Sequence, residues 1–315
     1  MSIRAGLVVL ACLTAAASSA RADQAIEGTE HKVPGISAAD GKPLSLNLWE
    51  KRRKDADPKV RVVLLAHGAT ISGRTDFDLQ VPPDKNGLPY SLMDELASHG
   101  YDVFSLDYQN YGLSDHHPCG LCVTTQAAAN DINAAVDYIR KLRNVDKVDL
   151  LGWSWGSSTT GLFAQQHPEK VHRLIQYAAC LQGGGGQAPQ EQFRKTELSK
   201  CCQDDFIPEF TDPGVYEAYG AAAVQSDPQA PNGVRADFAK KEPILNPKQI
   251  KVPTMMIYGA LDSSCTITQD ALPGYFRDLA TLDKQLIIIP EGGHALLLMK
   301  PRGKFFREVL KWLEM

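Results

Sequence analysis

The chain has 315 residues and a formal net charge of −4, from 33 Lys and Arg against 37 Asp and Glu. This mildly acidic balance does not favour a nucleic-acid partner, which would select a basic surface. The length suffices for one large domain with an insertion, and no apolar run after residue 22 is long enough to predict a membrane span.

Residues 1–22 have the pattern of an export signal. Arg4 gives a positive start, residues 7–13 are apolar, and Ala-Arg-Ala at residues 20–22 matches a small-residue cleavage site. The apolar run is too short to cross a bilayer. We therefore predict cleavage after Ala22 and a secreted or periplasmic protein. A lipid anchor on Cys12 is disfavoured, because cleavage there would leave almost no hydrophobic core in the signal.

Six cysteines follow the predicted signal, and their even number in an exported protein predicts disulfides. Their pairing stays open, since six cysteines allow fifteen pairings. The C-x-x-C spacing of Cys119 and Cys122 also occurs in redox and zinc sites, and His116 and His117 lie nearby. Because the ligand set for zinc is incomplete, we favour a structural disulfide. The six are Cys119, Cys122, Cys180, Cys201, Cys202 and Cys265.

Strand and helix patterns alternate through the first part of the chain. Residues 44–49 alternate polar and apolar side chains, which is typical of an outer antiparallel strand. Apolar runs at 60–66, 101–106, 148–152 and 171–178 predict buried strands. Periodic segments at 91–99 and 124–141 predict helices, and so does the segment that follows residue 156 and reaches to about residue 166. Such alternation predicts an α/β fold with a doubly wound, mostly parallel sheet.

The composition changes at four consecutive glycines, residues 183–186. From there to residue 251 the chain is rich in Gln, Pro, Asp, Ala and Lys and has no pattern of a buried strand. We predict an inserted helical cap, because structureless loops of this length are uncommon. Strands resume at 252–259 and 284–290, before a helix at 303–313. The predicted organisation is a signal peptide 1–22, a core in two parts, 23–182 and 252–315, and a cap 183–251.

The segment Gly152-Trp153-Ser154-Trp155-Gly156 lies between a predicted strand and a predicted helix. This is the context of the G-x-S-x-G nucleophile elbow. A serine hydroxyl needs a base to remove its proton, so it must project from the backbone where a histidine reaches it. The two flanking glycines let the strand and the helix approach each other without a clash of side chains.

Three further motifs follow predicted strands. His67-Gly68-Ala69 suits a loop that offers the backbone N–H of Ala69 to an oxyanion, with His67 holding the loop. Asp262 follows the strand at 252–259, and His294 follows the last strand. Asp107 also ends a strand, and we predict that it ties the next loop by hydrogen bonds to the backbone. In that loop, the side chains of Tyr108 and Tyr111 could line the mouth of a pocket.

With these motifs in order, the sequence resembles the α/β-hydrolase superfamily over essentially the whole chain after residue 22. The resemblance implies that Ser154 is the nucleophile, His294 the general base and then acid, and Asp262 the carboxylate that orients it. It also implies an oxyanion hole made by the backbone N–H groups of Ala69 and Trp155. A serine at the elbow argues against the haloalkane dehalogenase and epoxide hydrolase branches, which use Asp there.

The elbow and residues 164–171 are also similar to prolyl iminopeptidases. Those enzymes carry His-Gly-Gly-Pro-Gly in the oxyanion loop, whereas this chain reads His-Gly-Ala-Thr-Ile at residues 67–71. We therefore predict hydrolysis of small-molecule carboxylic esters or lactones through an acyl-enzyme, with no metal and no cofactor. The alternatives are an aminopeptidase or amidase, acyl transfer to another alcohol, and a non-catalytic binding protein on a hydrolase scaffold. The natural substrate and the oligomeric state stay open.

Overall fold

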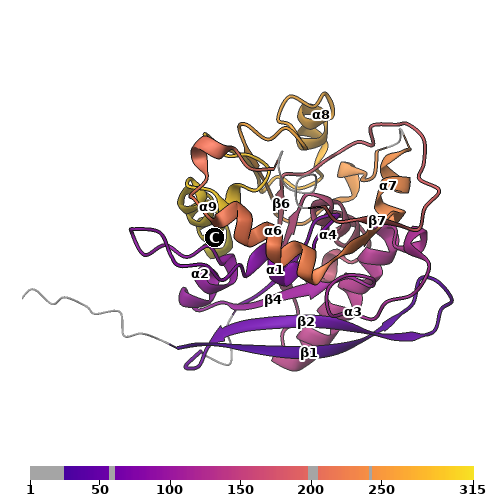
Figure 1. Ribbon diagram of the computed structural model, residues 1–315, viewed down its shortest axis with the longest axis horizontal. Helices are drawn as coiled ribbons and strands as arrows, with labels where there is room; N and C mark the ends of the chain where they lie inside the picture. The colour runs from indigo at the N-terminus through magenta and orange to yellow at the C-terminus, as the bar shows by residue number, and fades with distance from the viewer. Residues whose placement is uncertain (1–24, 57–60, 198–204, 241–242) are drawn as a thin grey trace, which may run out of the picture.

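The computed structural model describes residues 25–56, 61–197, 205–240 and 243–315, so the predicted export signal lies outside the described residues. Within them, eight strands form one sheet in the order β1-β2-β4-β3-β5-β6-β9-β10. Figure 1 shows the long strands β1 and β2 side by side at one edge of the molecule. The strands are β1 (Ile26–Ile36), β2 (Pro43–Arg53), β3 (Val62–Ala66), β4 (Asp102–Asp107), β5 (Val148–Trp153), β6 (Val171–Tyr177), β9 (Thr254–Gly259) and β10 (Lys284–Ile289).

The sheet is mostly parallel, as predicted. Only β1 with β2 and β2 with β4 pair antiparallel, and every other neighbouring pair is parallel. The predicted antiparallel strand at 44–49 is part of β2, but β1 and not β2 is the outermost strand. Strand β1 was not predicted from the sequence, because most of its side chains are polar and exposed and leave little apolar periodicity to detect.

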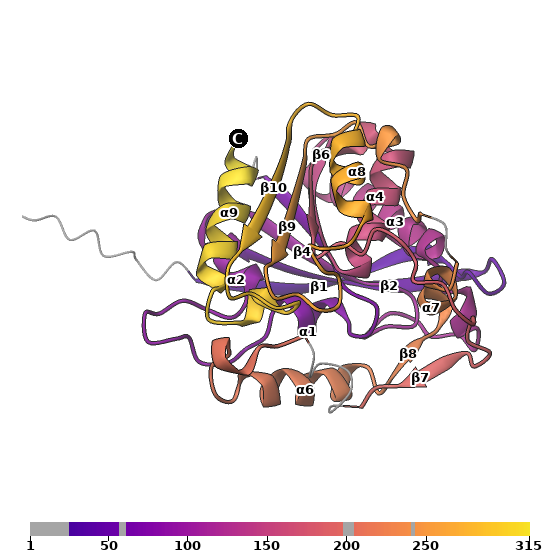
Figure 2. The same cartoon turned by 90° about the horizontal axis from the view of Figure 1, so that it is seen from above.

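Helices cover both faces of the sheet (Figure 2). One face packs against α3 (Thr125–Arg143), α4 (Trp155–Gln166) and α8 (Ala271–Asp278), whose buried residues share a hydrophobic cluster with β3 and β5. The opposite face packs against α2 (Leu92–Ser98) and α9 (Arg302–Glu314), which share a second cluster. Successive side chains of each strand point to opposite faces of the sheet, so they pack into two separate cores, as expected of a doubly wound sheet.

The predicted helices begin and end at local sequence signals. Thr124 caps α3 by accepting a hydrogen bond from the N–H of Ala127 at 3.2 Å, and Asn144 ends the helix in the left-handed conformation. Ser91 caps α2 by accepting a hydrogen bond from the N–H of Asp94 at 2.9 Å. These signals depend on few neighbouring residues, so the sequence located both helices within two residues.

The described part of the segment between β6 and β9 contains short elements. They are β7 (Phe193–Lys195), α6 (Val215–Ser226), β8 (Gln229–Pro231) and α7 (Gly233–Phe238), and β7 pairs antiparallel with β8. In Figure 2, α6, β7 and β8 lie beyond the carboxyl ends of β9 and β10. The expectation of no buried strand here was wrong for β8, whose Ala230 and Pro231 are buried. Three residues are too few to produce a detectable period.

Two disulfides join described cysteines. Cys119 bonds to Cys122, and Cys180 bonds to Cys265 across 85 residues of sequence. The first pair is the one favoured from the sequence, and its bond uses both thiols that a metal site would need. Cys201 and Cys202 lie outside the described residues. Among the helices of the described ranges, none is long and apolar enough to cross a membrane.

Candidate active site

Ser154 lies at the turn between β5 and α4, with φ 58° and ψ −119°. A positive φ is rare for a residue with a side chain and costs conformational energy, which the surrounding structure must supply. The turn is tight enough to require glycine on both sides. A Cβ on Gly152 would lie 2.1 Å from the carbonyl oxygen of Gly156, and one on Gly156 would lie 2.1 Å from that of Ala66. The backbone therefore has the geometry that the elbow motif predicted.

Asp262 and His294 form a hydrogen-bonded pair. The Nδ1 of His294 lies 2.9 Å from Oδ2 of Asp262, and both side chains are almost fully buried. The other oxygen of Asp262, Oδ1, accepts hydrogen bonds from the backbone N–H groups of Ser264 at 2.9 Å and Cys265 at 2.8 Å. Since the carboxylate is fixed at both oxygens, it holds the imidazole in one orientation, with Nε2 as the remaining ring nitrogen.

The surroundings of His294 also fix its backbone and its pKa. The indole N–H of Trp153 donates to the carbonyl of His294 at 3.0 Å, and the hydroxyl of Tyr177 donates to the same oxygen. Burial lowers the pKa of His294, but the hydrogen bond that His294 donates to Asp262 and the charges of Asp205 and Asp262 outweigh this effect. The pKa is therefore raised above its ordinary value.

Ser154 and His294 line one pocket of about 250 Å³ together with Ala69. The structure thus brings together the nucleophile, the histidine and the first of the two oxyanion donors predicted from the sequence. Trp155, the second donor, is the first residue of α4, and its side chain is buried. The first N–H groups of a helix have no acceptor within the helix, so the N–H of Trp155 is available to a bound group. The roles of these residues stay predictions.

His67 is a structural residue of the loop that carries Ala69, as predicted. Its Nδ1 donates to the carbonyl of Gly68 at 2.8 Å, and its Nε2 accepts from the N–H of Tyr108 at 3.2 Å. Burial lowers the pKa of His67 to about 4, although the bond to Gly68 and the charge of Asp227 act in the opposite direction. The ring is therefore neutral at pH 7, and both of its nitrogens are engaged.

The loop after β4 is tied down by Asp107, as expected. This carboxyl group accepts hydrogen bonds from the N–H groups of Gly73 at 3.0 Å and Leu113 at 3.1 Å, and burial raises its pKa to about 7. The suggestion that Tyr108 and Tyr111 line a pocket mouth was wrong, because both side chains are completely buried. Their hydroxyl groups find internal partners, which lowers the cost of burying them.

Sequence reasoning missed several side chains around this pocket. Asp76 of α1 (Gly73–Phe77) accepts a hydrogen bond from the hydroxyl of Tyr219 of α6 at 2.8 Å and from the N–H of Gly68 at 3.3 Å. Asp205, near the start of a described range, lines the same pocket. No motif marks these residues. Asp76 bonds to Tyr219 across 143 residues of sequence, and Asp205 bonds to Ser264 across 59.

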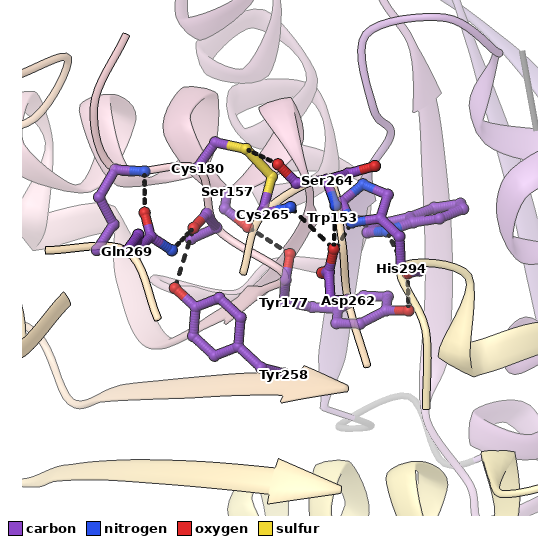
Figure 3. Close-up of a disulfide and its surroundings, with 12 residues drawn as sticks. Trp153, Ser157, Tyr177, Cys180, Tyr258, Asp262, Ser264, Cys265, Gln269 and His294 are labelled. Atoms are coloured by element: carbon purple, nitrogen blue, oxygen red, sulfur yellow. Dashed lines mark hydrogen bonds and ion pairs between the residues drawn. A yellow bond between two sulfur atoms is a disulfide. The ribbon is translucent and has the colours of Figure 1, made fainter. Parts of the chain in front are cut away.

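The Cys180–Cys265 disulfide forms part of the pocket wall, close to the Asp262–His294 pair (Figure 3). Cys180 lies just after β6, and Cys265 lies in the loop that follows Asp262. The N–H of Cys265 is one of the two donors to Asp262, so the disulfide ties that loop to the end of a neighbouring strand. The even number of cysteines predicted disulfides, but not this pairing or its position.

Comparison with known proteins points to the α/β-hydrolase fold, which the motifs of the sequence also predicted. Residues 61–196 match the family described as alpha/beta hydrolase fold. Protein ABHD8 of Homo sapiens is 24% identical over 245 residues, which are 70% of this chain and 51% of that protein. The chain thus spans about half the length of the curated relatives that it matches first.

Two solved structures superpose over nearly their whole lengths. A thermophilic esterase from Thermogutta terrifontis has a TM-score of 0.66 at 17% identity, over 91% of this chain and 98% of that one. An esterase from Exiguobacterium antarcticum has a TM-score of 0.64 at 17% identity, over 91% and 100%. Together with the sheet order and the elbow, these matches show that the chain is a protein of the α/β-hydrolase fold. The resemblance drawn from its motifs is thereby confirmed, while the similarity of its elbow to prolyl iminopeptidases stays a prediction.

Proposed function

We propose that this protein is a serine hydrolase that cleaves carboxylic esters or lactones with Ser154, His294 and Asp262. The observation that carries the proposal is their arrangement around one pocket. A serine in a strained elbow conformation lines it, beside a histidine that is hydrogen-bonded to a fixed carboxylate. Pairing a nucleophile with an oriented base is the arrangement that activates a hydroxyl group for covalent catalysis.

In the proposed mechanism, the hydroxyl oxygen of Ser154 attacks the carbonyl carbon of the ester while His294 takes its proton. The N–H groups of Ala69 and Trp155 stabilise the negative charge that develops on the carbonyl oxygen. Collapse of this intermediate expels the alcohol, which receives the proton from His294, and leaves an acyl-enzyme. Water then attacks the acyl group with His294 again as base, which releases the acid and restores Ser154.

The size of the pocket favours short esters. Its volume of about 250 Å³ lies below the range of about 300–1,000 Å³ that is typical of ligand pockets. The superposed proteins from Thermogutta terrifontis and Exiguobacterium antarcticum are esterases, which also favours ester hydrolysis. We also propose that the segment 183–251 is a cap over the pocket. We further propose that the protein is exported. The two disulfides support export, because disulfides persist in oxidising compartments.

An aminopeptidase is the second candidate, and one observation favours it. Recognition of a free α-ammonium group requires carboxyl groups near the acyl site, and Asp76 and Asp205 both line the pocket. However, burial raises the pKa of Asp76 well above its ordinary value. A carboxyl group that resists ionisation is a poor partner for a cation. The oxyanion loop also lacks the Gly-Pro-Gly of prolyl iminopeptidases, so we favour esters.

The test is a screen of chromogenic short esters, lactones and aminoacyl anilides with the purified protein and its Ser154→Ala variant. We expect aryl or alkyl esters to be turned over at least ~10²-fold better in kcat/KM than matched anilides, a difference of about 2.7 kcal/mol in transition-state binding. Turnover should vanish in Ser154→Ala. Efficient cleavage of a proline anilide that is abolished by blocking its amine would instead establish the peptidase. Substantial ester turnover by Ser154→Ala would refute the mechanism.

A further inference from the structure

The loop that carries Ala69 is held by side chains from distant parts of the chain. His67 donates to the carbonyl of Gly68 at 2.8 Å. The hydroxyl of Tyr111 donates to the carbonyl of Ala69 at 2.7 Å. The guanidinium of Arg194 donates to that same carbonyl, and also to the hydroxyl of Thr70 at 3.1 Å. Both peptide groups that flank Ala69 are thus fixed through their carbonyl oxygens.

Arg194 reaches this loop from the segment between β6 and β9. It lies in β7, which pairs with β8 in the register Arg194 to Ala230. Its Nη1 donates to the carbonyl of Pro231 at 2.6 Å and lies 3.4 Å from Oδ1 of Asn232, while its Nη2 makes the bonds to the loop. The planar guanidinium therefore bridges two parts of the fold, with one nitrogen on each side.

We propose that Arg194 is a positioning residue for the oxyanion hole, an inference that rests on the proposed function. The N–H of Ala69 belongs to the peptide group that carries the carbonyl of Gly68. Its position also depends on the next peptide group, which carries the carbonyl of Ala69, because the two groups meet at the Cα of Ala69. An oxyanion donor is effective only when it lies about 2.7–3.1 Å from the developing charge. Arg194 fixes one of those peptide groups, so the inserted segment helps to set the catalytic geometry of a loop that belongs to the core.

The charge of Arg194 contributes as well. Burial lowers the pKa of Arg194, but an arginine starts from a pKa above 12 and stays charged at neutral pH. The oxygens that accept its hydrogen bonds belong to carbonyl, amide and hydroxyl groups, which are neutral. A partly buried positive charge next to Ala69 raises the electrostatic potential where the oxyanion would form, which favours the transition state.

The test measures how fast a fluorophosphonate labels Ser154, and it needs no knowledge of the natural substrate. In this reaction the Oγ–P bond forms, the P–F bond breaks to release fluoride, and His294 takes the hydroxyl proton. The phosphoryl oxygen gains charge in the oxyanion hole. We expect Arg194→Met to be labelled about 10–10²-fold more slowly, which is less than the 10²–10³-fold cost of removing a donor outright. Arg194→Lys should recover part of the rate, because it keeps a charge and a donor.

The matched control is Arg173→Met. Arg173 is a buried arginine at the start of β6, where it stacks on Trp312 and pairs with Asp283 at 3.2 Å. The variant Arg173→Met should lose thermal stability but keep the labelling rate of the wild type. This control therefore separates a loss of stability from a loss of positioning in the oxyanion loop. Tyr111→Phe should slow labelling less than Arg194→Met, because its bond to Ala69 is not charge-assisted.

The outcomes are distinct. If Ser154 is labelled equally fast in the wild type and in Arg194→Met, the inference about Arg194 is wrong while the proposed function stands. If the wild type is not labelled at Ser154, the proposed function fails, and the inference fails with it. Should Arg194→Met not fold, as judged by circular dichroism, the same comparison is made with Arg194→Gln, which removes the charge and shortens the side chain. A wild-type labelling rate in that variant would overturn the inference.

Discussion

Removal of the Cys180–Cys265 disulfide should cost far more stability than removal of Cys119–Cys122. A disulfide stabilises mainly by restricting the unfolded chain, with an entropy of about −2.1 − 1.5R ln n cal/mol/K for a closed loop of n residues. The two bonds have sequence separations of 85 and 3. At 25 °C these values give about 4.6 kcal/mol for the first and about 1.6 kcal/mol for the second. The double variant Cys180→Ser/Cys265→Ser should therefore lose about 3 kcal/mol more than Cys119→Ser/Cys122→Ser.

The assay is urea unfolding followed by tryptophan fluorescence, with the free energy of unfolding extrapolated to water. Activity is measured on the same samples under native conditions. Because the N–H of Cys265 holds Asp262, loss of the first bond should also lower kcat by up to about 10²-fold, whereas loss of the second should leave it unchanged. Equal destabilisation by the two double variants would refute the reasoning. Six free thiols in denatured, unreduced protein from its native compartment would show that neither bond forms there.

Three further outcomes follow from the site. His294→Ala should lower kcat by about 10⁴–10⁶-fold, and Asp262→Asn by up to roughly 10⁴-fold, because the members of a triad act as a unit. A near-normal rate in either variant would assign that role to another residue. Because His294 must be neutral to act as base and its pKa is raised, kcat/KM should rise with pH through a value above 6.5, and this limb should move to lower pH in Asp262→Asn. A limb that does not move in that variant would contradict the pairing. Gly156→Ala should destabilise the fold by about 3 kcal/mol or more, since its Cβ would meet the carbonyl oxygen of Ala66 at 2.1 Å; a thermal melt like that of the wild type would show that the elbow relaxes.

The α/β class, the elbow and the placement of the motifs at strand ends could be predicted from the sequence. Each of these features depends on residues that are close together in the chain. An apolar run predicts a buried strand whatever it pairs with, and Gly152 and Gly156 mark a turn that few other residues tolerate. Caps such as Thr124 fix the ends of helices within one turn. The edge strand β1 escaped prediction for the same reason, since an exposed strand buries too little apolar surface to leave a pattern.

The contacts that complete the site are not local. Arg194 meets Ala69 across 125 residues, and Tyr219 meets Asp76 across 143. Nothing in the sequence around either partner marks these pairs. A hydrogen bond or a disulfide depends on where two segments lie after the chain has crossed the sheet, and several pairings satisfy the same local preferences. The sequence by itself therefore determined the fold class and the candidate triad. Only the tertiary structure decided which cysteines pair and which side chains hold the oxyanion loop, because those outcomes depend on the path of the chain between the partners.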